Sequence, residues 1–566
     1  MRFVMVNDRY LLRQESLGWL LLIALVVLGA GLGLRDPWPA DEPRFALIAK
    51  EMVESCQWLF PMRGGEIYPD KPPLFMWGIA IGYLLTGSIK VAFLLPSLLA
   101  GLLTIALVWD LGRRLWSAQV GFMAGLLLLF TVQFTLQAKT AQIDALVTFF
   151  ITLGVYGFVR FLLCGGGWRW YWLGWFAAGL GIITKGVGLL ALLILIPAVW
   201  THREKIRAAT RGDWLKGLAG PLFMVLAIAL WLVPMLLAVA QSGDPVLQAY
   251  RDNILLRQTV TRYANAWHHV KPFWYYLTSV IPPFWLPLSL LLPWLVVAWR
   301  KAIQGQDRRI ILLLGYLVLV ILFFSASPGK RGVYVTPGTP ALALLTAPFV
   351  ADLLARIWPA RLLGGLGWLL GIICMGGAGA LAFSARLASR LGDLGPAPWL
   401  PLLAMGGALL LVNALLRRAP LSALICSLAV GWLIYSSWIC VRLNDMRTPE
   451  GVMALAAERV PAGNELLLAG FKEQHLLFSQ RPLRHYPYLM GDGEQAREAA
   501  AWIAAAPGRW VLGAADLMAV CFDADRMESL GNRHRTDWLL AGPEALKPAC
   551  RGLSPQIAPF SYAPGP

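Results

Sequence analysis

The stretch that decides the fold is residues 38–78, WPADEPRFALIAKEMVESCQWLFPMRGGEIYPDKPPLFMWG, which follows the first apolar run and precedes many others. It contains two charged clusters, Asp41-Glu42-Pro43-Arg44 and Asp70-Lys71-Pro72-Pro73. Between them, apolar residues recur at i, i+3, i+4, i+7 and i+8 from Phe45 to Val53, which predicts an amphipathic helix lying on a membrane surface. We expect the chemistry of the protein in this charged loop.

The composition around this loop is typical of a membrane protein. The 566 residues are 58% hydrophobic and only 14% charged, and the mean hydropathy is +0.61. A helical span needs roughly 20 apolar residues, and many such runs are present. We therefore predict a polytopic α-helical membrane protein with about thirteen transmembrane helices.

The net charge of +17 could indicate a nucleic-acid partner. However, the Lys and Arg residues lie in short clusters between apolar runs, which is the positive-inside pattern of membrane proteins. We therefore expect membrane lipids around the chain and no nucleic acid. Arg2, Arg9 and Arg13 place the N-terminus in the cytoplasm. The apolar run from Gly18 to Leu34 is interpreted as a retained span and not as a cleaved signal peptide.

This topology defines two domains. Residues 1–441 form the membrane domain, with the loop 35–73 on the outer side, and residues 442–566 form a tail on that same side. Residues 74–88 are short for a span and predict a second interfacial helix. The runs within 171–201 predict two short spans that meet at an outer apex, Lys185.

The tail changes character and predicts a small α/β domain. It contains strand-like ELLLAGF from Glu465, helix-like GDGEQAREAAAWIAAA from Gly491 and strand-like RWVLGA from Arg509. Its two cysteines, Cys521 and Cys550, form either a disulfide, as an oxidising compartment permits, or two unpaired thiols. The chain has no CxxC spacing, which argues against a cysteine metal cluster.

Several ionisable residues are expected on the outer side or at membrane depth beside it, where such groups are costly and usually functional. Cations near a carboxylate suit an anionic phosphate ligand beside a base. The residues are Asp41, Arg44, Asp70, Lys71, Asp144, Lys185, His269 and Lys330.

Each of these residues also has a structural interpretation. Asp41 could cap the amphipathic helix, and Asp70 could cap the helix that starts at Pro72. Lys71 and Lys330 could bind lipid head groups. Asp144 and Lys185 could form one pair between spans, and His269 could be an interfacial residue beside His268.

Six stretches, taken together, resemble a known family. They are ADEPRFALIAKEM, YPDKPPLFMW, QIDALVTFF, ITKGVGLLAL, HHVKPFWYYL and SPGKRGVYV, in family order from about residue 38 to 340. The chain resembles the GT-C membrane glycosyltransferases that use polyprenyl-phosphate-linked sugars. It is most similar to the lipid A aminoarabinose transferase group, glycosyltransferase family 83, which neighbours the protein O-mannosyltransferases.

The resemblance implies roles for the site residues. Asp41 matches the catalytic carboxylate of the first outer loop. Donor-phosphate contacts are expected from Arg44, Lys71, Lys330 and Tyr334. Asp144 and Lys185 match an acidic and a basic position near the cavity. No cofactor is required, although Asp70 and His269 match an acid and a histidine that can hold a zinc ion.

The resulting hypothesis is a bacterial inner-membrane glycosyltransferase, a hexosyl- or pentosyltransferase that inverts the sugar. It would move a sugar from undecaprenyl phosphate to a periplasmic acceptor, which could be lipid A, another glycan or a protein. Two alternatives remain open: a protein O-glycosyltransferase of the mannosyl type, which only the acceptor distinguishes, and a lipid-carrier flippase, which would not need Asp41.

Overall fold

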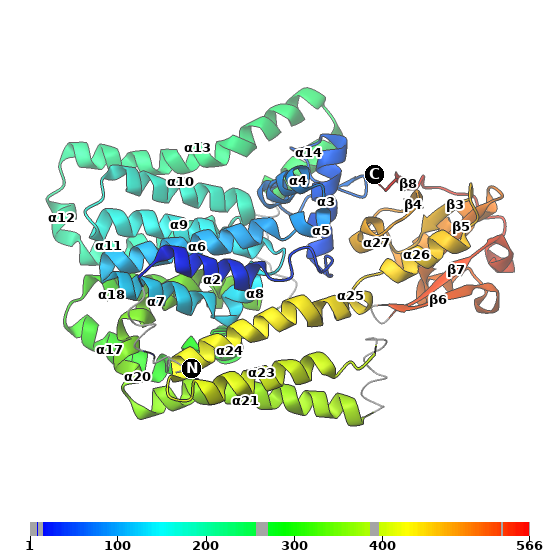
Figure 1. The fold of residues 1–566 in the computed structure, drawn as a ribbon. Coiled ribbons are helices and arrows are strands. Elements are labelled where there is room, and N and C mark those ends of the chain that lie inside the picture. Colours follow the sequence, from blue (N-terminus) through cyan, green and yellow to red (C-terminus); the bar gives the residue numbers. More distant parts are fainter. Residues whose placement is uncertain (1–7, 9–14, 256–269, 385–395, 534–535, 565–566) are drawn as a thin grey trace.

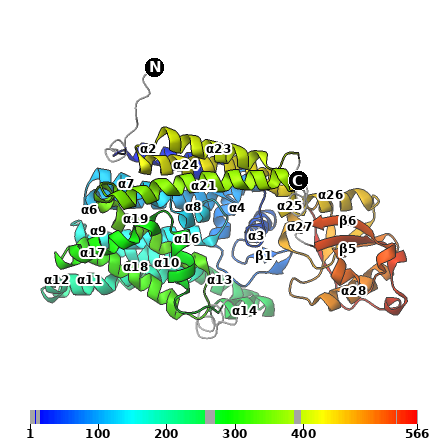
Figure 2. The ribbon, with the colours of Figure 1, turned by 90° about the horizontal axis from the view of Figure 1, so that it is seen from below.

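The protein consists of a helical part and a smaller sheet-containing part, as seen in a computed structural model. The structure describes residue 8 and residues 15–255, 270–384, 396–533 and 536–564. The helical part occupies one end of the molecule and the strands β3 to β8 occupy the other end (Figure 1). The two views agree that α3 (Glu42–Ser55) lies between these parts (Figures 1 and 2).

The helical part contains long apolar helices. Within the described residues, seven helices are long and apolar enough to cross a membrane, or up to nine if each of two bent pairs is one span. The pairs Ala118–Leu129 with Val132–Ala138 and Tyr276–Phe284 with Leu288–Gln304 are bent by 71° and 112°. The seven helices are Ile89–Leu115, Ile143–Leu163, Arg211–Ser242, Arg308–Ala326, Gly332–Leu354, Ile357–Phe383 and Pro420–Arg447.

The remaining runs that were expected to span the membrane are also helical but shorter or less apolar. The predicted number of thirteen spans therefore stays a prediction, while the helical nature of the runs is confirmed. The helices concerned are α2 (Leu17–Gly29), α10 (Trp168–Lys185), η1 with α11 (Val187–Thr201) and α23 (Leu400–Leu415).

Helix α10 ends at the apex that the sequence predicts. The next residue, Gly186, has a φ of +82°, a conformation that favours glycine, and the 3₁₀ helix η1 (Val187–Ile194) starts directly after it. Before this turn, α10 packs closely on α9 (Ile143–Leu163), since a Cβ atom on Gly157 would lie 2.5 Å from the carbonyl oxygen of Trp170. This close packing of α9 and α10 helps to hold Asp144, in the first turn of α9, near Lys185 at the apex.

Helix α3 forms where the apolar spacing predicts a helix, but lipid does not cover its apolar stripe. Phe45 packs edge-on against Phe75 of α4 (Leu74–Thr86), with ring centroids 5.2 Å apart. Leu47 joins an apolar cluster with Leu466 and Leu476 of the C-terminal part. The amphipathic helix is therefore confirmed with its apolar stripe buried by protein, and its position at the membrane surface stays a prediction.

The C-terminal part is built on one mixed sheet with the strand order β6-β7-β5-β3-β4-β8. Its three central strands are parallel, and antiparallel strands extend both edges. The strand-like and helix-like segments of the tail thus have the predicted secondary structure. The elements are β3 (Glu465–Leu468), β4 (Leu483–His485), α28 (Asp492–Ala504), β5 (Arg509–Ala514), β6 (Glu528–Arg533), β7 (Thr536–Ala541) and β8 (Phe560–Tyr562).

The expected boundary between the two domains, at residues 441 and 442, falls inside a helix. The span Pro420–Arg447 continues without a gap through α25 (Cys440–Arg447), and α26 (Glu450–Arg459) follows after a short turn. The sequence places the boundary too early in the helix because Arg442 and Asp445 are polar, although the backbone stays helical.

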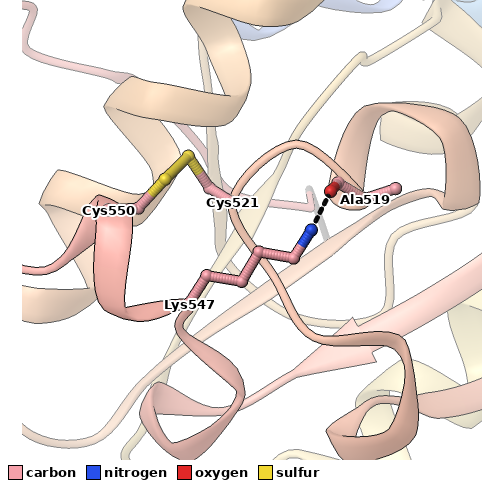
Figure 3. Close-up of a disulfide and its surroundings, with 4 residues drawn as sticks. All are labelled: Ala519, Cys521, Lys547 and Cys550. Carbon is pink, nitrogen blue, oxygen red and sulfur yellow. Dashed lines mark hydrogen bonds between the residues drawn. A yellow bond between two sulfur atoms is a disulfide. The ribbon is translucent and has the colours of Figure 1, made fainter.

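Cys521 and Cys550 form a disulfide, which decides between the two alternatives for these thiols (Figure 3). Beside the bridge, Lys547 Nζ donates to the carbonyl oxygen of Ala519 at 2.5 Å. Both sulfur atoms are buried within the apolar cluster that lies on one side of the sheet. The bridge therefore ties η10 (Pro548–Cys550), which follows β7, to the turn after α29 (Ala515–Met518).

Removing this disulfide should destabilise the C-terminal part. The two cysteines are 29 residues apart in sequence. Closing a loop of this size contributes about 3 kcal/mol to the free energy of unfolding. We expect Cys521→Ser with Cys550→Ser to lower the stability by about that amount, measured by pulse proteolysis in urea. A reducing agent should lower the stability of the wild type to that of the variant and leave the variant unchanged. Equal stability of wild type and variant would contradict this role.

Candidate functional site

Asp41 stands at the N-terminal end of α3, but its carboxylate does not cap the helix. Its backbone has φ −93° and ψ −34°, and it makes no capping hydrogen bond with its side chain. A capping residue normally has extended backbone, which directs its side chain over the first turn. The carboxylate instead lies 3.6 Å from Arg44 Nη1 and 3.9 Å from Arg331 Nη2. The interpretation of Asp41 as a helix cap alone is therefore wrong.

The side chain of Asp41 lines a cavity of about 280 Å³ between the first loop and the membrane helices. Its lining includes apolar residues such as Leu28, Leu32 and Trp432. Its charged residues carry more positive than negative charge, which favours an anionic ligand. Its charged residues are Arg35, Asp41, Glu42, Lys139, Arg331 and Arg447.

The neighbouring acid, Glu42, has a structural role. Its two oxygens accept from Arg35 Nη1 and Nη2 at 2.5 and 2.6 Å, which is a bidentate pair. They also accept from the backbone N–H groups of Trp38 at 2.8 Å and Ala141 at 3.0 Å. Because these contacts occupy both oxygens of Glu42, Asp41 is the carboxylate of this cluster that is suited to act on a ligand.

Lys139 is a cavity residue that sequence reasoning missed. Its ammonium group donates to the carbonyl oxygens of Val27, Leu28 and Ala30, at 2.7, 3.2 and 2.9 Å, and so binds the C-terminal end of α2. A single lysine at the end of an apolar run was the signal that could have identified it. Arg447 was also missed; its guanidinium lies 5.2 Å from the ring centre of Trp38.

Asp144 and Lys185, which could form a pair by sequence, lie together with Tyr334 in the structure. Lys185 Nζ is 2.5 Å from Asp144 Oδ1, and it lies 5.0 Å from the ring centre of Tyr334. Both members of the ion pair are largely buried, with side-chain exposures of 13% and 11%. The pair between spans is thus present, and a ligand contact by these three residues stays a prediction.

The loop between α18 (Arg308–Ala326) and η5 (Gly332–Gly338), called the late loop below, places Arg331 beside Asp41. Lys330 is buried, and its ammonium group donates to the carbonyl oxygens of Lys271 at 3.0 Å and Ser327 at 2.5 Å. It therefore orders the loop, whereas its neighbour Arg331 lines the cavity and is 48% exposed. The phosphate contact predicted for Lys330 stays a prediction, and Arg331 is an additional candidate.

Asp70 and Lys71 precede α4 in a short surface segment. The N-cap position of α4 is Pro73, so Asp70 does not cap this helix. His269, the other predicted zinc ligand, lies outside the described residues. Within the described ranges, no group of three or more His, Cys, Asp or Glu residues is arranged to hold a metal ion. The zinc site therefore stays a prediction.

Arg44 reaches the C-terminal part of the chain. Its Nε donates to Glu473 Oε1 at 2.8 Å, and its guanidinium lies 5.9 Å from the ring centre of Tyr68. Burial raises the pKa of Tyr68, so its phenol stays neutral at physiological pH. The sequence contains no signal for the contact with Glu473, because the two residues are 429 positions apart.

A buried acid also holds the turn that follows α3. Glu51 Oε1 accepts from the backbone N–H of Gly64 at 2.8 Å, between β1 (Met62–Arg63) and β2 (Glu66–Ile67). Burial raises the pKa of Glu51 to about 7. This contact fixes the hairpin that carries Arg63 toward the C-terminal part, so the hairpin adds a second cation beside Arg44.

Destroying the pair of Asp144 and Lys185 should destabilise the helical part. Lys185→Met leaves the Asp144 carboxylate buried without its counterion, at a cost of about 3–5 kcal/mol. We expect Lys185→Met to lower the midpoint of thermal unfolding in detergent. The double variant Lys185→Met with Asp144→Asn should recover most of the loss, because no buried charge remains. If the single variant were as stable as the wild type, the pair would have no structural role.

The amino-acid sequence is similar to those of known glycosyltransferases. Residues 70–231 match the family model described as dolichyl-phosphate-mannose-protein mannosyltransferase. The chain is 33% identical over 352 residues to the undecaprenyl phosphate-alpha-4-amino-4-deoxy-L-arabinose arabinosyl transferase 1 of Pseudomonas fluorescens, which is 60% of each chain. It is 29% identical over 485 residues to the transferase of that name from Edwardsiella ictaluri, covering 80% of this chain and 82% of the relative.

A solved structure shows the same fold. The crystal structure of ArnT from Cupriavidus metallidurans bound to undecaprenyl phosphate superposes with a TM-score of 0.72 at 19% identity. The match covers 94% of this chain and 100% of that one. The chain therefore has the helical GT-C fold of ArnT, and the resemblance expected from its motifs is confirmed. This chain covers about 60% of the length of the first arabinosyl transferases that it matches.

Proposed function

We propose that this protein is a membrane glycosyltransferase that moves a sugar from an undecaprenyl-phosphate carrier to an acceptor. The observation that carries this proposal is the position of Asp41 on a cavity lined by both apolar and cationic residues. Such a lining suits a lipid with an anionic head, because apolar residues can contact the lipid chain and cations can contact the phosphate. The names of the relatives, which include undecaprenyl phosphate, agree with this donor.

The reaction is a substitution at the anomeric carbon of the donor sugar. A hydroxyl or phosphate oxygen of the acceptor attacks C1, and the bond between C1 and the carrier phosphate breaks with its electron pair on the phosphate oxygen. Asp41 takes the proton of an acceptor hydroxyl, and attack from the opposite face inverts C1. Arg331 on the cavity and Arg44 beside Asp41 stabilise the charge that develops on the leaving phosphate, with Lys71 and Tyr334 as further predicted contacts, while Lys330 orders the loop that carries Arg331.

The acceptor class follows less directly from the site. The names of the relatives specify an aminoarabinose donor, and the apolar residues that line the cavity suit a lipid acceptor such as lipid A or lipopolysaccharide. Another glycan or a protein is the alternative, and the matching mannosyltransferase family model supports a protein acceptor. A panel of acceptors separates these options without any change in the residues that are proposed to act.

We further propose thirteen spans in a bacterial inner membrane, with the N-terminus in the cytoplasm and both the first loop and the C-terminal part in the periplasm. Contact between Arg44 and Glu473 requires those two segments to lie on the same side. With a cytoplasmic N-terminus, an odd number of spans before the first loop and before the C-terminal part places both in the periplasm. The disulfide between Cys521 and Cys550 also suits the oxidising periplasm.

The first test is transfer by Asp41→Asn. The change keeps the size of the side chain but removes the base, so we expect a loss of at least about 100-fold in turnover. Purified protein is mixed with a panel of undecaprenyl-phosphate sugars and acceptors, and released undecaprenyl phosphate is measured. Asp492→Asn, the same change at an exposed position of α28, is the matched control. Wild-type turnover by Asp41→Asn would refute the assignment, and transport without transfer by all three proteins would support a flippase.

The two cations of the late loop can be separated in the same assay. If Arg331 contacts the donor phosphate, Arg331→Ala should weaken donor binding by about 2 kcal/mol, which is roughly thirtyfold. Lys330→Met, in contrast, should mainly lower the stability, because Lys330 holds backbone carbonyl groups. The measurements are undecaprenyl phosphate binding and thermal unfolding of each variant. Unchanged binding by Arg331→Ala together with weaker binding by stably folded Lys330→Met would reverse the assignment.

A further inference from the structure

Glu473 joins the C-terminal part of the protein to the first loop. It is the first residue of α27 (Glu473–Leu477), and its side chain is only 3% exposed. Its Oε1 accepts from Arg44 Nε at 2.8 Å and lies 3.7 Å from Arg63 Nη1. A buried carboxylate is costly unless it is paired, so these two cations stabilise its charged form.

Arg44 in turn contacts two carboxylates with different edges of its guanidinium group. Its Nε binds Glu473, and its Nη1 lies 3.6 Å from Asp41 Oδ1. On the far side of Asp41, Arg331 Nη2 lies 3.9 Å from Oδ2. The charges thus alternate from Glu473 to Arg44, Asp41 and Arg331, and the series runs from the C-terminal part through the first loop to the late loop.

Because guanidinium is planar, the bond to Glu473 limits how the guanidinium of Arg44 can be oriented. Once Nε is held by Glu473, rotation of the group is restricted, and Nη1 on the other edge lies toward Asp41. A side chain of this length otherwise has many rotamers, and ordering it costs free energy. Without Glu473, Asp41 would be the remaining carboxylate close to Arg44, and the guanidinium could turn fully onto the proposed base.

We propose that Glu473 is a positioning residue of the active site, which holds Nε of Arg44 so that Nη1 on the other edge of the guanidinium is directed toward Asp41 and the donor phosphate. The C-terminal part of the chain thereby completes the site and does more than cover it. This inference rests on the proposed function, because the donor phosphate is the ligand that Arg44 is positioned to meet. It assigns a role to a residue outside the membrane helices and outside the stretches that carry the family resemblance.

Binding of undecaprenyl phosphate to purified full-length protein tests the inference. We expect Glu473→Ala to bind about tenfold more weakly than the wild type and to have a lower kcat, because Arg44 loses its orientation. Glu473→Gln should fall between them, since its amide oxygen can still accept from Arg44 Nε. The control is Glu465→Gln, which removes an acid that pairs with Arg484 and Arg509 within the sheet. This control should bind the lipid as the wild type does.

A double-variant cycle separates positioning from a merely structural role. If Glu473 acts through Arg44, Glu473→Ala should weaken binding in the wild type but cause no further loss in an Arg44→Ala background. An equal loss in both backgrounds would overturn the inference, as would wild-type affinity in Glu473→Ala and Glu473→Gln. Failure of the wild type itself to bind undecaprenyl phosphate would instead refute the proposed donor, and the inference with it.

Discussion

The buried pair of Arg35 and Glu42 is the interaction on which the rest of the site depends. Two charges removed from water cost several kcal/mol each, and only good geometry with further hydrogen bonds offsets that cost. Here the pair is bidentate, and Glu42 also accepts from the backbone of Trp38 and Ala141. Arg35 donates to the carbonyl oxygens of Asp36 and Lys139. These contacts together fix the conformation of the first loop where it leads into α3.

Fixing the start of α3 determines what its two sides meet. The stripe around Phe45 packs on α4, and Leu47 on another side packs on the C-terminal part. Arg44 lies on the same helix, so its contact with Glu473 follows from this placement. A helix that carries the proposed catalytic acid is therefore enclosed by protein from both parts of the chain. That enclosure keeps Asp41 in register with the late loop, whose Arg331 approaches it from another direction.

Much of this architecture could be predicted from local patterns. Apolar runs and basic loops indicated the order of the helices, and the turn at Lys185 and Gly186 was visible as a charged break in an apolar stretch. Residues that contact their sequence neighbours, or that stand out in apolar surroundings, were found in this way. The partner of Arg44 was not, because a single sequence contains no signal that pairs it with Glu473. The residues that cover α3 could not be predicted for a related reason: amphipathic spacing shows that a stripe is buried but not which surface buries it.

Adjacent residues of like charge show most clearly what sequence reasoning could not decide. Asp41 and Glu42 are neighbours, as are Lys330 and Arg331, and within each pair either residue could have been the functional one. The structure separates them by the groups that each side chain satisfies. Glu42 accepts two backbone N–H groups and Lys330 donates to two backbone carbonyls, so moving either would leave buried backbone groups unpaired.

Asp41, in contrast, meets Arg44 and Arg331 through ion pairs of 3.6 and 3.9 Å, which a bound phosphate or acceptor could replace at little cost. Arg44 is intermediate, since one edge of its guanidinium is tied to Glu473 and the other faces Asp41. In this loop, therefore, the side chains suited to bind substrate are those that the protein holds least tightly. Their tightly bound neighbours provide the frame that keeps them in place.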